Sequence, residues 1–95
     1  MKAILKEVGK KPKEVEIENA LEALQKAVGG YIEPHNFDDG LVMLYNEEGK
    51  IKGLPVNFEM CWGYIFGDVL FVQDGGDEFT DLSDKNKALV FECFE

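Results

Sequence analysis

The first third of the chain changes from a strand-like to a helix-like hydrophobic pattern. Apolar side chains between Ala3 and Val8 predict a short edge or half-buried strand, and Glu14 to Glu18 alternates acidic with apolar positions, which is typical of a second strand. From Asn19 to Val28 the apolar residues instead follow helical spacing. We expect Asn19 to cap this helix with Glu22 as its capping-box partner, and the glycines at 29 and 30 to end it.

Extended patterns dominate the middle of the chain. Tyr31 to Phe37 predicts an edge strand, because Pro34 has no N–H to give to a neighbouring strand. Leu41 to Tyr45 is a continuous apolar run, which is typical of a central strand. A hairpin-type turn follows around Gly49, after which Ile51 to Leu54 is expected to return as an antiparallel strand.

The C-terminal third predicts one further buried strand and one further helix. Asp68 to Gln73 has the pattern of a strand, and Ser83 is placed to cap a helix over about 83–94. With 95 residues, the chain is long enough for one domain, 1–95. The elements together predict an α+β fold, with a small mixed, mostly antiparallel sheet of four to five strands and two helices.

Charge narrows the range of partners. The net charge is −9 and all ten basic residues are lysine. Residues 1–30 hold six lysines and five acids, whereas residues 31–95 hold four lysines and fourteen acids. An acidic surface without arginine argues against direct nucleic-acid binding and against docking on an anionic membrane. The charged start of the chain and the shortness of its apolar runs predict no signal peptide and no membrane span, and therefore a cytoplasmic protein.

Few residues are available for catalysis. The chain has one serine, one threonine and one histidine, namely Ser83, Thr80 and His35, and Ser83 is already needed as a helix cap. No spacing indicates a metal site, a phosphate-binding loop or a cofactor. Cys61 and Cys93 are expected to be buried, reduced thiols. We therefore expect a protein that binds rather than catalyses, with no catalytic residues, metal or cofactor.

The segment from residue 53 to residue 68 concentrates residues with special chemistry. An asparagine amide pairs a donor with an acceptor, and tryptophan and tyrosine rings offer flat faces for stacking, so a planar heterocycle such as a nucleobase would fit here. The alternative, which these residues taken alone favour, is structural: the asparagine closes a turn and the tryptophan fills the core. The candidate ligand-binding residues are Pro55, Asn57, Phe58, Trp62, Tyr64 and Asp68.

Several stretches of the sequence resemble a known family. They are residues 21–33, 46–57, 65–72 and 79–84, and the most specific is Gly53-Leu54-Pro55-Val56-Asn57. The chain resembles domain-of-unknown-function family 3846, an uncharacterised family of bacteriophages and mobile elements. Members often carry an arginine directly after the asparagine, where this chain has Phe58. The resemblance implies an accessory protein of a phage or mobile element.

Two hypotheses of function follow. In the first, the protein counters host anti-phage defence by sequestering a small nucleotide-type immune signal, in an infected or element-carrying bacterium and as a homo-oligomer. In the second, the acidic region mimics nucleic acid and inhibits a basic host defence protein, such as a nuclease, restriction enzyme or CRISPR protein. An accessory role in replication or packaging, outside defence, is the third alternative. The loop 53–64 is expected at a sheet end or a subunit contact.

Overall fold

The computed structural model describes all 95 residues and contains two sheets. The main sheet has the order β2-β1-β7-β4-β3, with β8 paired to β7, and a separate hairpin is formed by β5 and β6. Every strand pair is antiparallel. The strands are β1 (Lys2–Lys6), β2 (Lys13–Glu16), β3 (Ile32–Asn36), β4 (Leu41–Asn46), β5 (Val56–Met60), β6 (Gly63–Phe66), β7 (Val69–Asp74) and β8 (Phe79–Thr80), and the helices are α1 (Leu21–Val28) and α2 (Asp84–Cys93).

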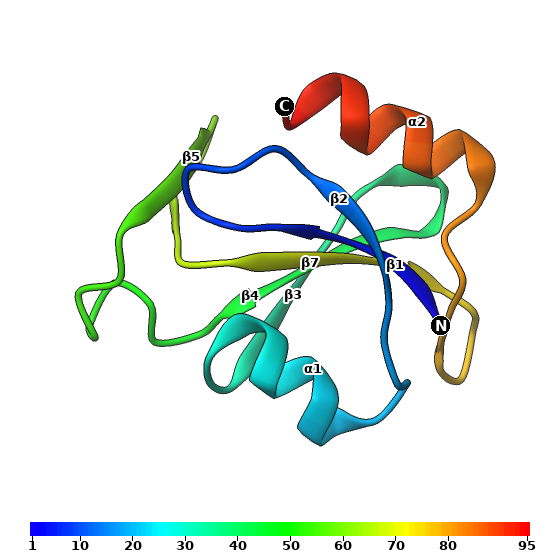
Figure 1. Cartoon of the computed structure of the whole chain (residues 1–95), viewed down its shortest axis with the longest axis horizontal. Coiled ribbons are helices and arrows are strands. Elements are labelled where there is room, and N and C mark those ends of the chain that lie inside the picture. Colours follow the sequence, from blue (N-terminus) through cyan, green and yellow to red (C-terminus); the bar gives the residue numbers. More distant parts are fainter.

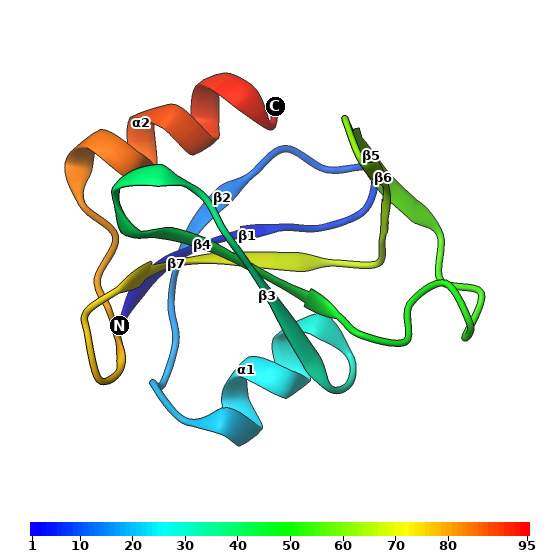
Figure 2. The ribbon, with the colours of Figure 1, turned by 180° about the vertical axis from the view of Figure 1, so that it is seen from behind.

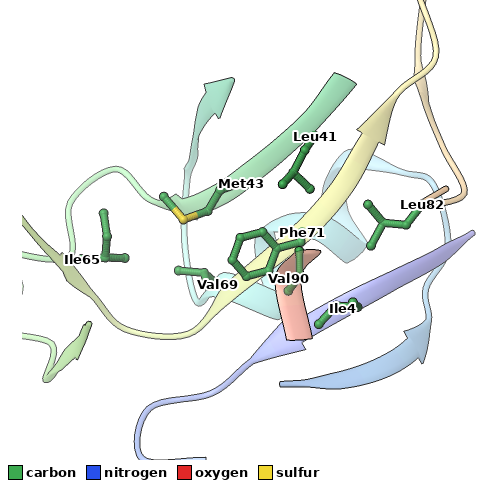
Figure 3. Packing of buried hydrophobic residues seen from close by; sticks show 8 residues of the cluster. All are labelled: Ile4, Leu41, Met43, Ile65, Val69, Phe71, Leu82 and Val90. Carbon is green, nitrogen blue, oxygen red and sulfur yellow. The ribbon is translucent and has the colours of Figure 1, made fainter. Parts of the chain in front are cut away.

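The main sheet lies between two covering layers. Helix α1 covers one face, and α2 covers the other together with the β5–β6 hairpin (Figures 1 and 2). The central strand β7 supplies both faces, because side chains alternate along a strand. Val69 and Phe71 point towards α2, whereas Leu70 and Val72 point towards α1. Figure 3 shows Phe71 at the centre of the cluster on the α2 side, with Val90 of α2 beside it.

The predicted fold class is confirmed, and most strands lie where the pattern placed them. The central positions of β4 and β7 and the edge position of β3 agree with the sequence. Strand β1 is paired on both sides, to β2 and β7, so it is an internal strand and not an edge. The main sheet path has five strands, and β8 adds a short sixth.

The predicted cap of α1 is wrong. The helix begins at Leu21, and its N-cap residue Ala20 makes no side-chain bond to the helix. Asn19 lies one residue too early, and its amide donates instead to the backbone oxygen of Phe79 at 2.6 Å. The end of the helix is as expected, since Gly29 takes a left-handed conformation with φ of 80°.

The cap of α2 is confirmed. The Ser83 hydroxyl oxygen accepts a hydrogen bond from the backbone N–H of Asn86 at 3.1 Å. This bond satisfies one of the free N–H groups at the helix start.

The predicted strand from Ile51 to Leu54 is wrong. Residues 47–53 form successive turns, closed by local bonds such as Leu54 N–H to the Gly49 oxygen at 2.9 Å. Ile51 is 85% exposed, so this apolar side chain has no sheet face to cover. The strand begins only after Pro55, as β5, and it pairs with β6 instead of β4. The special segment therefore lies in a hairpin at one end of the main sheet (Figure 2).

Candidate functional site

Asn57 ties the hairpin to the main sheet. Its amide nitrogen donates to the backbone oxygens of Lys6 and Gly67, each at 2.8 Å. Its amide oxygen accepts from the Lys6 ammonium group at 2.9 Å. Both amide hydrogens are therefore used within the chain, and the side chain joins β5, the end of β1 and the turn before β7.

The neighbouring residues complete this connection. The Gly67 N–H donates to the Pro55 oxygen, and the Asp68 carboxylate accepts from the Val8 N–H, at 2.8 and 2.9 Å. Gly67 has φ of +81°, and a Cβ there would lie 2.8 Å from Leu54 Cδ1. The positive φ favours glycine at this position. Asn57 thus has a structural role, but both details of the structural alternative are wrong: Asn57 lies in β5 and does not close a turn, and Trp62 is 48% exposed and does not fill the core.

A cavity of about 370 Å³ opens between the hairpin and the end of α2. Figure 1 shows β5 and the C-terminal end of α2 facing each other at this corner of the molecule. We call it the hairpin pocket; its lining is Lys6, Asn57, Phe58, Glu59, Met60, Cys61, Cys93, Phe94 and Glu95. Its volume lies within the usual range for small-molecule sites.

Lys6 is the distinctive group of the hairpin pocket. It is only 7% exposed, and its ammonium nitrogen donates to Asn57 Oδ1 at 2.9 Å and to the Glu7 backbone oxygen at 3.0 Å. No carboxylate lies within 4.0 Å of it, in contrast to the exposed Lys13, which pairs with Glu7 at 3.0 Å. An ammonium group has three hydrogens, so one remains for another acceptor. Lys6 is therefore a buried cation without a counter-ion.

Aromatic rings wall the hairpin pocket. The Phe58 and Phe94 rings meet edge to face, with centroids 5.0 Å apart. Phe94 also contacts the core residue Phe71, at 4.7 Å, so the pocket wall continues into the hydrophobic core. Cys61 and Cys93 are free and exposed, which corrects the expectation of buried thiols: Cys61 lies in the turn between β5 and β6, and Cys93 is the last residue of α2.

A second aromatic group lies at the tip of the hairpin, against β3 and β4. Trp62 is 48% exposed, and its ring lies 5.0 Å from His35 of β3 and 6.5 Å from Tyr45 of β4. Burial, and the nearby carboxylate of Glu33, raise the pKa of Tyr45 above its usual value. Tyr64 is 56% exposed, since it points away from the core-facing Ile65 that follows it. We call Trp62, His35 and Tyr45 the outer aromatic group.

The six predicted ligand residues fall into four places. Asn57 and Phe58 line the hairpin pocket, Trp62 belongs to the outer aromatic group, and Tyr64 is exposed on β6. Pro55 and Asp68 line a different cavity of about 310 Å³ beside the end of α1. No single cavity holds all six, and a ligand role for each stays a prediction.

Sequence reasoning missed Lys6 and the contribution of α2. The signal for Lys6 was present: it stands two residues after Ile4, so it faces the same side of β1 as a fully buried core residue. A lysine on the apolar face of a strand is unusual, because lysine is almost never fully buried unless its charge is paired. Cys93 and Phe94 carried no such signal, because only the packing of α2 brings them to the hairpin.

No metal centre or membrane-spanning helix is found. No group of three or more histidine, cysteine, aspartate or glutamate side chains is arranged to hold a metal ion. Neither helix has the length and apolar character needed to cross a bilayer. His35 packs between Phe37 and Trp62, with ring centroids 4.7 and 5.0 Å away.

Comparison with known proteins places the chain in a family. Neither the curated proteins nor the solved structures contain a match. One family model, described as "Domain of unknown function (DUF3846)", matches residues 1–95. Because this match covers the full sequence, the chain belongs to the DUF3846 family.

Proposed function

We propose that this protein is a non-enzymatic binding protein whose hairpin pocket takes a small nucleotide-type ligand. The observation that carries the proposal is the buried ammonium group of Lys6, which has one free hydrogen and no counter-ion within 4.0 Å. A buried charge is costly unless it is paired. An anionic ligand would supply the missing partner.

The remaining lining suits the organic part of such a ligand. Phe58, Met60 and Phe94 present apolar and aromatic surface beside the cation. Aromatic side chains stack on planar heterocycles, and a cavity of about 370 Å³ is of a suitable size for a mononucleotide. In a chain without arginine, lysine is the side chain left to hold an anionic group.

The biological setting belongs to the same proposal. We propose that the protein serves a bacteriophage or mobile element, and that it counters host anti-phage defence by removing a nucleotide-type signal from solution. The pocket lies on the side of the molecule where the hairpin approaches the end of α2. A homo-oligomer would allow a second subunit to cover that side and slow the release of the ligand.

The exposed acids favour a second candidate function, inhibition of a basic host defence protein. Five exposed carboxylates follow each other within eleven residues: Asp74, Asp77, Glu78, Asp81 and Asp84. Only Asp84 lies within 4.0 Å of a lysine, at 3.9 Å from Lys87. A basic partner would bind this segment in a salt-dependent way. Capture of a basic protein from host lysate at low salt, and its loss at high salt, would support this alternative.

Isothermal titration calorimetry with a panel of nucleotides tests ligand binding in the hairpin pocket. The matched variants are Lys6→Met, which removes the buried charge while keeping an unbranched side chain, and Lys50→Met, which removes an exposed charge outside the pocket. We expect Lys6→Met to weaken binding by about 10- to 100-fold, the value of a hydrogen bond to a charged group, and Lys50→Met to leave it unchanged. Absence of heat with every nucleotide, or equal binding by both variants, would reject the proposal.

A further inference from the structure

We infer that the hairpin pocket selects ligands with a single negative charge, a phosphodiester and not a terminal phosphate. This inference rests on the proposed function and concerns the chemical class of the ligand. It follows from a count of the donors and of the charges that line the pocket.

The first step is the number of hydrogen-bond donors. Only Lys6 and Asn57 bring side-chain nitrogens to the hairpin pocket. Both amide hydrogens of Asn57 already bond to backbone oxygens, and the Lys6 ammonium has two of its three hydrogens in use. The thiols of Cys61 and Cys93 are weak donors. The side chains of the lining therefore offer one strong hydrogen bond, which is enough for one anionic oxygen.

The second step is the charge around that donor. Lys6 is the only cation in the lining, and Glu59 and Glu95 bring two exposed carboxylates to the same pocket. A ligand with one negative charge would neutralise Lys6. Any additional negative charge would stay unpaired near two carboxylates, and an unpaired charge in a partly buried site is unfavourable. The carboxylates thus act against multiply charged ligands.

The number of donors and the charge of the lining together favour some phosphate groups of nucleotides over others. A phosphodiester has one negative charge per phosphate, whereas a terminal phosphate monoester has a charge of about −1.5 to −2 at pH 7, and a triphosphate has more. Proteins that hold such polyphosphates use several backbone N–H groups, basic side chains or a metal ion. The side chains of this lining provide one lysine and no arranged metal ligands.

The test compares ligands that differ only in their phosphate. Calorimetry at low salt is performed with adenosine 3′,5′-cyclic monophosphate, adenosine 5′-monophosphate and adenosine triphosphate, and repeated with the corresponding guanosine compounds. We expect the cyclic phosphodiester of at least one base to bind about tenfold or more tightly than its 5′-monophosphate, and the triphosphate to bind weakest. Tighter or equal binding of the monophosphate or triphosphate would overturn charge selection and leave ligand binding in place, whereas no binding of any compound would overturn both.

A variant at Glu59 tests whether the pocket carboxylates cause the selectivity for singly charged ligands. Glu59→Gln removes one pocket carboxylate without changing the shape of the side chain, and Glu22→Gln makes the same change on the exposed surface of α1. If carboxylates exclude doubly charged ligands, Glu59→Gln will reduce the preference for the phosphodiester by several fold, and Glu22→Gln will leave it unchanged. An unchanged preference in Glu59→Gln would contradict the role of the Glu59 carboxylate in this selectivity.

Discussion

The two faces of the main sheet are packed in different ways. The face under α1 is packed mainly with aliphatic side chains, and Leu24 and Val28 of the helix belong to the same cluster as Leu44 and Leu70. The face under α2 carries the aromatic side chains, including Phe71 and its neighbours, and it ends in an open cavity with a buried lysine. Each face borders a cavity, of about 310 Å³ beside the end of α1 and of about 370 Å³ at the hairpin, but only the second is lined by a buried lysine.

The two covering layers differ in their number of elements, with one helix on the first face and a helix plus a hairpin on the second. Helix α1 has eight residues and covers the middle of its face, with Gly29 turning the chain back to β3. On the opposite face, α2 and the hairpin approach from two directions, and the hairpin pocket lies where they meet. A contact between two elements that are distant in sequence is a common place for a binding site.

The largest expected effect is on the face under α1. Leu44 is fully buried in β4 under α1, so Leu44→Ala removes apolar contacts and leaves a cavity. We expect the free energy of unfolding to fall by about 2–5 kcal/mol, as measured by urea denaturation. Ligand affinity of the folded fraction should stay unchanged, because Leu44 is on the other side of the sheet from the pocket. A loss below about 1 kcal/mol would mean that this face repacks easily, and the contrast between the faces would then fail.

A smaller and more local effect is expected at Asn57. Asn57→Ala removes three hydrogen bonds and leaves two backbone oxygens and the Lys6 ammonium with fewer partners. We expect a loss of about 2–4 kcal/mol, based on about 1–3 kcal/mol for each buried group left unsatisfied and partial access of water. Hydrogen exchange should speed up in β5 and β6 and remain slow in β4 and β7.

Asn36→Ala is the matched control for this prediction. Asn36 is exposed on the edge strand β3, and its side chain makes no hydrogen bond within the chain. The same change of residue type there should alter stability by less than about 0.5 kcal/mol, as is usual for surface positions. Equal effects of Asn57→Ala and Asn36→Ala would show that Asn57 does not hold the hairpin.

Local patterns predicted the sheet well and the hairpin poorly. The apolar run of β4 and the strand β7 follow from periodicity alone, because burial on both faces selects continuous apolar residues. The hairpin depends on distant partners: Asn57 bonds to Lys6, fifty-one residues away in sequence. The turns over residues 47–53 also keep Ile51 out of the sheet, so the next strand begins only at Val56 and pairs with β6.

The candidate site was predictable only in part. Asn57, Trp62 and Tyr64 were identified by residue type, but their separation into a connecting amide and exposed aromatic rings required the fold. Phe94 reaches Phe58 only because α2 crosses the sheet towards the hairpin. A pattern along the chain contains no information about such a meeting of two elements.

The smallest expected effect concerns Tyr45, a residue of β4 that belongs to the outer aromatic group. Burial, and then Glu33, raise the pKa of Tyr45 in the folded chain. The unfolded chain therefore loses the phenol proton first as the pH rises past about 10, the ordinary value for tyrosine. Since the folded state then binds more protons than the unfolded state, stability should be constant below that pH and should fall above it. Thermal unfolding between pH 8 and pH 11 measures this decrease, and Tyr45→Phe should reduce it, whereas Tyr64→Phe, at the exposed position, should not. A decrease of the same size in Tyr45→Phe and in the unchanged chain would contradict this prediction and would assign the alkaline loss of stability to other groups.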